Sequence, residues 1–325
     1  MKHISAFVFA VGCIASALPG SASAETYPDR VVRIIVPFAA GGGVDIMARA
    51  LAAELGQKWG QAVVVENVPG ANSMIGAQRA ATSQPDGYTL LMTNPSTVVG
   101  NRFLYKELPY DPAKSFVPIS MLARTAQVIL TNAQSPINNM QDLATAARRA
   151  PNTISYGTPG RGSQEHLLLE TIAKHEKVDL LGVSYRGIAP AITATLAGEV
   201  NLTAASPGLS ATLIAAGKLK PLAIASEKRA AMFPQVPTTT EAGMPYARSS
   251  IWFGLFGVAG TPQEILKKIH ADVTAVAKEP KFVETNLTAR GVELVANTPE
   301  EFAADLRSDV ALTADMVKVI GLQPE

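Results

Sequence analysis

The sequence predicts an α/β protein of two lobes with a ligand cleft between them. First, apolar runs of strand length alternate with helix-like segments along the chain, a pattern typical of parallel sheets that are covered by helices on both faces. Second, the alternation falls into two series that meet near residue 126, and 325 residues are enough for two domains with separate cores.

The first series begins with the apolar run VVRIIVPF, a strand at residues 31–38. A helix from Val44 to Trp59 follows, because Met47, Leu51 and Leu55 recur at helical spacing. The next elements are a strand at 62–68, a helix at 73–83 and a strand at 88–93 that ends in the turn NPST.

The second series shows the same alternation. Strands are expected at 126–132, 153–157, 181–185, 200–205 and 219–226. Helices are expected at 139–150, 164–175, 191–198 and 209–217. The segment at 233–250 is rich in proline, threonine and glycine, which favours a crossing between the lobes.

The tail contains a strand at 251–260, a helix from Pro262 to Ala277 and a final strand–helix pair at 292–317. These elements are too few for a third core, so we expect the tail to return to the first lobe. The predicted domains are therefore residues 25–125 with 250–325 for lobe 1, and residues 126–249 for lobe 2. Ligands of open α/β sheets bind outside the carboxyl ends of the strands, which places the expected site in the cleft.

Residues 1–24 have the pattern of a cleaved signal peptide, with Lys2, an apolar stretch at 4–18 and Ala22-Ser23-Ala24 before the cleavage point. The apolar stretch is too short for a stable membrane anchor, so we expect export to the periplasm. Cys13 is the only cysteine, and its removal with the signal peptide excludes a disulfide or a thiol nucleophile from the mature chain. The formal charge of +1 and the lack of a basic run argue against a nucleic-acid partner.

Two strand-to-helix loops carry the clearest chemistry, PFAAGGGVD at residues 37–45 and GTPGRGSQEH at residues 157–166. Each combines a glycine bend with the free N–H groups of a helix start, which favour negative charge. Asp45 is expected to cap the helix that follows the first loop. One such loop in each lobe suits an anionic ligand held between them.

Other chemistries have weaker support. Neither loop has the lysine of a nucleotide-binding P-loop, and Glu165 stands where a dinucleotide fingerprint needs its last glycine. His166 and His175 are nine residues apart on one expected helix, so they cannot share a metal. Ser163 with His166 is the one pair that an exported hydrolase could use, and this hydrolase stays open as an alternative.

The chain resembles the periplasmic solute receptors of the tripartite tricarboxylate transporter family, also called Bug receptors. Five stretches carry the resemblance in order: YPDRVVRIIVPFAAGGGVDIMARALA, VVVENVPGANSMIGAQRAATSQPDGYTLL, SYGTPGRGSQEHL, VSYRGIAPAITATLAGEVNL and VPTTTEAGMP. The resemblance implies a two-lobed periplasmic-binding-protein fold, similar to type II and of the Venus-flytrap kind, that closes on a carboxylate without chemistry. It implies no cofactor and no metal.

The resemblance also assigns the ligand-binding residues. It implies that loop backbone groups and bridging waters hold the carboxylate. In the first lobe the residues are Phe38, Ala39, Gly42, Gly43, Asn94 and Ser96, and in the second lobe they are Gly160, Arg161, Gly162, Ser163, Tyr185, Arg186, Gly187 and Ser206. Arg186 is the strongest candidate for pairing with a carboxylate, since a guanidinium matches that group bidentately.

One departure from the family pattern bears on the ligand. Many relatives carry an aspartate after the strand VNLTAA, whereas this chain has Ser206 near that point. The missing charge favours a dicarboxylate without an amine, including an aromatic diacid such as terephthalate, over an amino acid. We expect a monomer that delivers its ligand to the membrane subunits of a tripartite tricarboxylate transporter or to a sensor. A receptor for an amino acid or another solute that is not a diacid remains an alternative.

Overall fold

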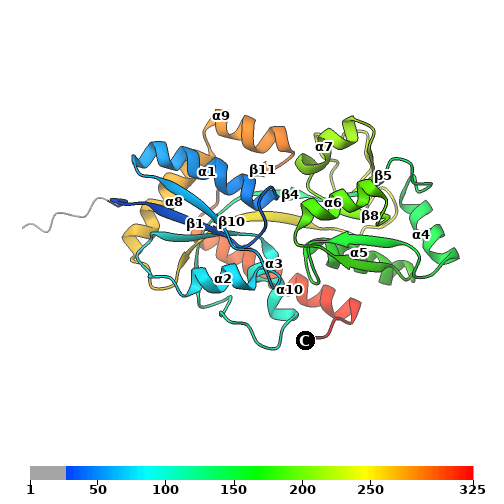
Figure 1. Cartoon of the computed structure of the whole chain (residues 1–325), viewed down its shortest axis with the longest axis horizontal. Coiled ribbons are helices and arrows are strands. Elements are labelled where there is room, and N and C mark those ends of the chain that lie inside the picture. The colour runs from blue at the N-terminus through cyan, green and yellow to red at the C-terminus, as the bar shows by residue number, and fades with distance from the viewer. Residues whose placement is uncertain (1–26, 325) are drawn as a thin grey trace, which may run out of the picture.

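The computed structural model describes residues 27–324, and the predicted signal peptide lies outside the described residues. Figure 1 shows two lobes side by side, each with helices on both faces of a central sheet. One sheet has six strands and the other has five. The predicted two-lobed α/β architecture is therefore present.

The six-stranded sheet forms the first lobe, with the strand order β11-β4-β10-β3-β1-β2. Its strands are β1 (Val32–Val36), β2 (Val63–Asn67), β3 (Thr89–Thr93), β4 (Phe116–Ala126), β10 (Ser250–Val258) and β11 (Glu293–Leu294). Strand β1 pairs in parallel with both β2 and β3, and Ile34 lies opposite Val65 and Leu90. Strand β10 pairs antiparallel with β3 and β4, and β11 pairs antiparallel with β4.

The five-stranded sheet forms the second lobe, with the strand order β7-β6-β8-β5-β9. Its strands are β5 (Val128–Asn132), β6 (Ser155–Thr158), β7 (Leu181–Ser184), β8 (Leu202–Ala205) and β9 (Leu219–Ile224). Strand β6 pairs in parallel with β7 and β8, whereas β5 pairs antiparallel with β8 and β9.

The expectation of parallel sheets was wrong for the strands that join the lobes. Strand β4 leaves the first lobe and continues after Gln127 into β5, while β10 brings the chain back. In the first sheet, the leaving strand β4 and the returning strand β10 lie side by side and run in opposite directions. In the second sheet, β5 runs antiparallel to β8 and β9, so both sheets are mixed. In addition, no strand was predicted in the region of β4.

The helices of the first lobe cover the two faces of its sheet. They are α1 (Gly43–Trp59), α2 (Met74–Ala81), α3 (Pro95–Val98), α8 (Gln263–Ala277), α9 (Pro280–Phe282) and α10 (Pro299–Ile320). Ile34 of β1 packs with residues of α1 and α8, whereas Ile35 packs with residues of α2 and α10. This period-two alternation of apolar side chains gives the sheet one core on each face.

The second lobe repeats this arrangement. Its helices are α4 (Met140–Arg149), α5 (Gln164–Glu176), α6 (Ile188–Ala197) and α7 (Pro207–Ala215). Ile129 of β5 packs with residues of α4 and α5, whereas Leu130 packs with residues of α6 and α7. The starts of α5, α6 and α7 lie at the carboxyl ends of β6, β7 and β8, so three strand-to-helix loops meet at one edge of the sheet.

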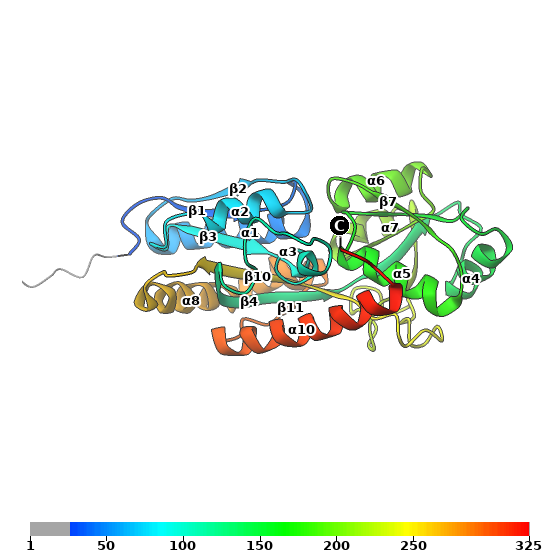
Figure 2. The same ribbon diagram turned by 90° about the horizontal axis from the view of Figure 1, so that it is seen from below.

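Helix α10 contacts both lobes (Figure 2). It begins with a capping box, in which the Thr298 hydroxyl accepts the Glu301 N–H and the Glu301 carboxylate accepts the Thr298 N–H. It packs on β4 in the first lobe and against α5 in the second. The domain boundaries at 125/126 and 249/250 stay a prediction. No helix in residues 27–324 combines the length and apolar character needed to cross a membrane.

Candidate functional site

The glycine loop between β1 and α1 exposes the start of α1. Gly42 precedes the helix and cannot offer a side-chain cap, and Gly41 has a left-handed φ of 84° that turns the chain. Asp45 is not the cap that the sequence predicted. Its carboxylate instead accepts the Gly41 N–H at 2.9 Å and pairs with Arg49, so it holds the shape of the loop.

The protonation state of Asp45 fits this role. Burial alone would raise the pKa of its carboxyl, but hydrogen bonds from Arg49, Gly41 and Asn67 outweigh burial and hold that pKa below its ordinary value. The carboxylate is therefore charged and already bonded, and the first N–H groups of α1 remain available to a ligand.

A short polar loop follows β3. The Asn94 side chain accepts the Ser96 N–H at 3.0 Å and caps the short helix α3. Both residues therefore have fixed positions at the carboxyl end of the sheet, beside the glycine loop.

The loop between β6 and α5 is largely occupied by its own capping contacts. The Ser163 hydroxyl accepts the His166 backbone N–H at 3.2 Å, and the Gly162 N–H points to Nδ1 of His166 at 3.2 Å. Burial lowers the pKa of His166, which favours the neutral ring that this second contact needs. Ser163 and His166 thus act as a helix cap, and these contacts do not form a nucleophile–base pair.

A cavity between the lobes, here called the cleft cavity, has a volume of about 70 Å³. At roughly 10–15 Å³ for each water, it has room for several waters or a small organic acid. Eight of the predicted residues line it: Phe38, Ala39, Gly42, Gly43, Asn94, Ser96, Gly187 and Ser206. The structure therefore brings the glycine loop, the loop after β3 and the starts of α6 and α7 together.

The other six predicted residues do not line the cleft cavity; they are Gly160, Arg161, Gly162, Ser163, Tyr185 and Arg186. The Arg161 guanidinium donates to the Gln323 carbonyl at 2.9 Å, and Ser163 is buried as a helix cap. Arg186 is exposed at the end of β7, an edge strand. The binding roles of these six residues remain predictions.

Glu165 lines the cleft cavity and was not among the predicted site residues. It lies in the first turn of α5, its side chain is only 4 % exposed, and burial raises its pKa to about 7. Its own backbone N–H and the nearby polar side chains of Ser163 and Gln127 oppose that rise without cancelling it. Its position within the predicted loop at residues 157–166 was a usable clue, but burial cannot be read from the sequence.

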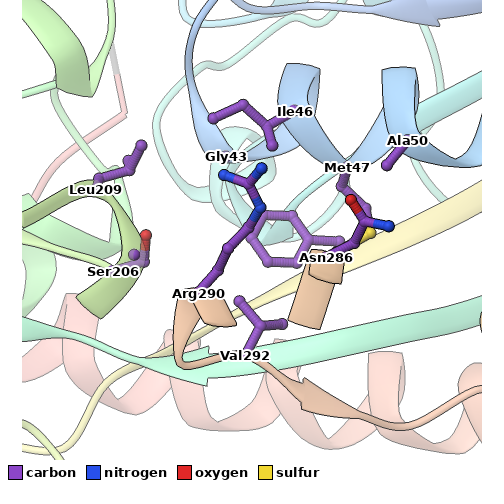
Figure 3. Close-up of a pocket in the computed structure, with 11 residues that line it drawn as sticks. Gly43, Ile46, Met47, Ala50, Ser206, Leu209, Asn286, Arg290 and Val292 are labelled. Atoms are coloured by element: carbon purple, nitrogen blue, oxygen red, sulfur yellow. The ribbon is translucent and has the colours of Figure 1, made fainter. Parts of the chain in front are cut away.

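A second, smaller cavity of about 20 Å³, here called the side cavity, adjoins the cleft cavity. The two share four lining residues, Gly43, Ser206, Leu209 and Phe253. Arg290 enters the side cavity from the tail, and Figure 3 shows its guanidinium pointing toward Gly43 and Ile46 of α1. The buried Nε of Arg290 has no hydrogen-bond partner among the described residues.

The two lobes are in contact across the cleft. Nδ2 of Asn72, in the first lobe, donates to the Arg161 carbonyl of the second at 3.1 Å. A Cβ placed on Gly187 would lie 3.8 Å from the Cβ of Ala39. The structure is therefore a closed arrangement. Within residues 27–324, no group of three or more His, Cys, Asp or Glu side chains could hold a metal ion.

Comparisons of the sequence and of the structure with known proteins agree on one family. A family model described as the tripartite tricarboxylate transporter family receptor matches residues 47–322. Protein BugT of Bordetella pertussis is 32% identical over 300 residues, which cover 92% of this chain and 92% of BugT.

Three solved structures are also similar. The periplasmic binding protein BugD is 33% identical with a TM-score of 0.87, and the alignment covers 92% of this chain and 100% of BugD. Rpa4515 of R. palustris, solved with adipate, is 31% identical with a TM-score of 0.89, and the coverage is 92% and 100%. MatC of Rhodopseudomonas palustris, solved with bound malate, is 30% identical with a TM-score of 0.85, and the coverage is 90% and 100%.

Proposed function

The chain belongs to the tripartite tricarboxylate transporter receptor family, and on that premise we propose that its cleft captures a small organic dicarboxylate. Members of this family are periplasmic solute-binding proteins, so the chain is a receptor and not an enzyme. The relatives solved with adipate and with malate hold acids that each carry two carboxyl groups, which supports a diacid as the ligand here.

The observation that carries the proposal is the meeting of the cleft cavity and the side cavity at Gly43 and Ser206. The cleft cavity offers peptide N–H groups at helix starts and the short polar side chains of Asn94 and Ser96, which suit one carboxylate. The side cavity offers the Arg290 guanidinium, which suits another. A ligand with an anionic group at each end would use both cavities.

Aromatic side chains extend the range of diacids to be tested. Phe38 and Phe253 both line the cleft cavity. Aromatic rings pack favourably on one another in offset or edge-to-face contacts, so a ring between two carboxylates has a suitable wall here. Terephthalate is therefore a candidate beside the aliphatic diacids.

The proposal includes export and delivery. Cleavage after Ala24 would release the receptor into the periplasm, where it would act as a monomer. It would pass the closed, loaded form to the membrane subunits of a tripartite tricarboxylate transporter, or to a sensor. In the described residues the two lobes are in contact across the cleft. This arrangement supports a mechanism in which the ligand contacts both lobes only after they close.

An amino acid is the alternative ligand, and Glu165 is the observation that favours it. An ionised carboxylate in the cleft cavity would attract the ligand's ammonium group. The two ligand classes differ in the charge that they place next to Glu165, so they can be separated by experiment.

A thermal unfolding screen of the mature protein tests the proposal. The panel contains adipate, malate, terephthalate and succinate, with aspartate and glutamate as amino-acid arms. A ligand present at 100 times its Kd stabilises the folded state by about 2.7 kcal/mol, which raises the Tm by several degrees. A shift with a diacid supports the proposal, whereas shifts with the amino acids alone, or a crystal structure with the diacid outside the cleft, would overturn it.

A further inference from the structure

Among the described residues that line the cleft cavity, Glu165 is the only one with an ionisable side chain. Every other residue that lines the cleft cavity among residues 27–324 is apolar, a glycine, or the neutral Asn or Ser. The Glu165 side chain is only 4 % exposed, so an ionised carboxylate there would stand in a poorly solvated position. That charge would also repel an anionic ligand. A receptor for diacids therefore needs this carboxyl in its neutral form.

The neighbouring ionisable groups on the helix of Glu165 are already engaged. The Glu170 carboxylate accepts the Tyr156 hydroxyl at 2.5 Å, and Nδ1 of His166 faces the Gly162 N–H. The Arg161 guanidinium in the preceding loop bonds the Gln323 carbonyl, toward the end of the chain. No charged side chain is among the causes of the raised pKa of Glu165, which comes from burial.

The groups that face Glu165 from other elements are neutral. Gln127, in the segment that joins β4 to β5, lies close enough to lower the pKa of Glu165 slightly, yet neither atom of its amide completes a hydrogen bond with a described residue. The start of α7 contributes Ser206, and the first lobe contributes Asn94 and Ser96 to the same cavity. None of these groups can neutralise a carboxylate by charge.

We infer that Glu165 carries a proton in the ligand-bound receptor and donates it in a hydrogen bond to an oxygen of the ligand, or to a water that bridges to it. A protonated carboxyl is a donor, whereas an ionised one can only accept. Glu165 thereby selects ligands that present an acceptor, such as a carboxylate, and disfavours those that present an ammonium group. The inference rests on the proposed function, since it assumes a diacid in the cleft.

Proton uptake follows from this arrangement. Above pH 7 the unliganded receptor has lost the proton, because burial in the closed arrangement places the pKa of Glu165 at about 7 and opening of the cleft would expose the carboxyl to water. Binding of a dianion must then return the proton to Glu165. The Kd is therefore expected to be nearly constant between about pH 6 and 7, where the diacid is mostly a dianion, and to weaken by about tenfold for each pH unit above pH 7.

Isothermal titration calorimetry tests the inference on the unmodified mature protein. The tightest diacid of adipate, malate, terephthalate and succinate is titrated near pH 6 and near pH 8.5, each in two buffers with different ionisation enthalpies. Near pH 8.5 the enthalpies should differ between buffers by an amount that corresponds to uptake of about one proton. Near pH 6 they should agree. Glu165→Gln, which mimics the protonated carboxyl, should bind with similar Kd at both pH values.

A matched variant and two contrary outcomes complete the test. Glu199→Gln changes an exposed carboxylate just after the end of α6 and should keep the pH dependence of the wild type. A pH-independent Kd for the wild type, or an unchanged pH dependence in Glu165→Gln, would overturn the role of Glu165 and leave the diacid receptor intact. If no diacid binds at either pH, while an amino acid binds more tightly as pH rises, both the diacid proposal and this inference fail.

Discussion

The side-chain amide of Asn72 joins the two lobes: its Nδ2 atom lies 3.1 Å from the Arg161 carbonyl oxygen and 2.8 Å from Oδ1 of Asn101. The Asn101 amide returns a hydrogen bond to the Asn72 carbonyl at 2.9 Å. Asn72 also lines the cleft cavity and has a left-handed φ of 49°, a conformation that asparagine tolerates better than most residues. Its hydrogen bond to the Arg161 carbonyl therefore lies inside the cleft and requires the two lobes to be in contact.

Replacement of Asn72 by glycine should weaken ligand binding. Glycine keeps the left-handed backbone, so the change removes the interlobe hydrogen bond without adding strain. A hydrogen bond of this kind contributes about 0.5–1.5 kcal/mol, so the Kd is expected to rise by about 2- to 10-fold, mainly through faster dissociation. Stopped-flow dissociation and calorimetry measure both values.

Asn152→Gly is the matched control for this change. Asn152 is exposed, lies outside the cleft and has a similar left-handed φ of 58°. It should leave the Kd at the wild-type value. Equal Kd values for the two variants would show that the Asn72 side chain has no part in closure.

Gly162→Ala should obstruct closure. A Cβ at Gly162 would lie 2.2 Å from Cδ1 of Leu104, a buried residue of the opposite lobe. The overlap exists only when the lobes meet, so its cost, about 1–3 kcal/mol for overpacking, falls on the ligand-bound form. The radius of gyration from small-angle X-ray scattering should shrink less on ligand addition than in the wild type.

Gly198→Ala separates this steric effect from backbone strain. Gly198 has a φ of 75°, close to the 73° of Gly162, but no atom lies within 4 Å of the position of its Cβ. Both variants should lose about 1 kcal/mol of free energy of unfolding. Only Gly162→Ala should lose affinity, and a similar loss in Gly198→Ala would contradict the steric explanation.

Part of this architecture was predictable from local patterns. The glycine bend at 41–43 and the helix from Val44 follow from the spacing of glycines and apolar residues, and the loop does reach the cleft. The antiparallel pairing of β4 and β10 could not be predicted, because the residues that meet there are more than a hundred positions apart. Long-range pairing leaves no periodicity in a single sequence.

Arg186 and Arg290 show which features of a site local sequence context can indicate. Arg186 follows a predicted strand and precedes a glycine, a favourable local context, but β7 is an edge strand and the side chain is exposed. Arg290 has no motif around it and reaches the side cavity only because the tail returns to the first lobe. Sequence context gives the position along a strand, whereas the direction of a side chain depends on the assembled sheet.

A comparison of two arginine variants shows whether Arg290 or Arg186 binds the ligand. Arg290→Met keeps most of the length of the side chain and removes the guanidinium. The loss of a charge-assisted hydrogen bond, which contributes about 1.5–3 kcal/mol, should raise the Kd for a diacid by about 10- to 100-fold. Arg186→Met should change the Kd by less than about twofold. Calorimetry on both variants would reverse the assignment if Arg186→Met caused the larger loss.

Glu165 should also make the stability of the empty receptor depend on pH. Its pKa is about 7 in the folded state and 4.5 in the unfolded chain, so the folded state holds the proton more tightly. The resulting stabilisation is fully present below pH 4.5 and is lost as pH rises to 7. From the size of this shift the loss is about 3 kcal/mol.

Glu165→Gln removes the titrating carboxyl and with it this pH dependence. The difference in unfolding free energy between wild type and variant, measured by urea denaturation, should therefore change by about 3 kcal/mol between pH 4.5 and 8. Because other titrating groups cancel in that difference, a value that stays constant with pH would mean that the pKa of Glu165 in the folded receptor is not raised above its value in the unfolded chain.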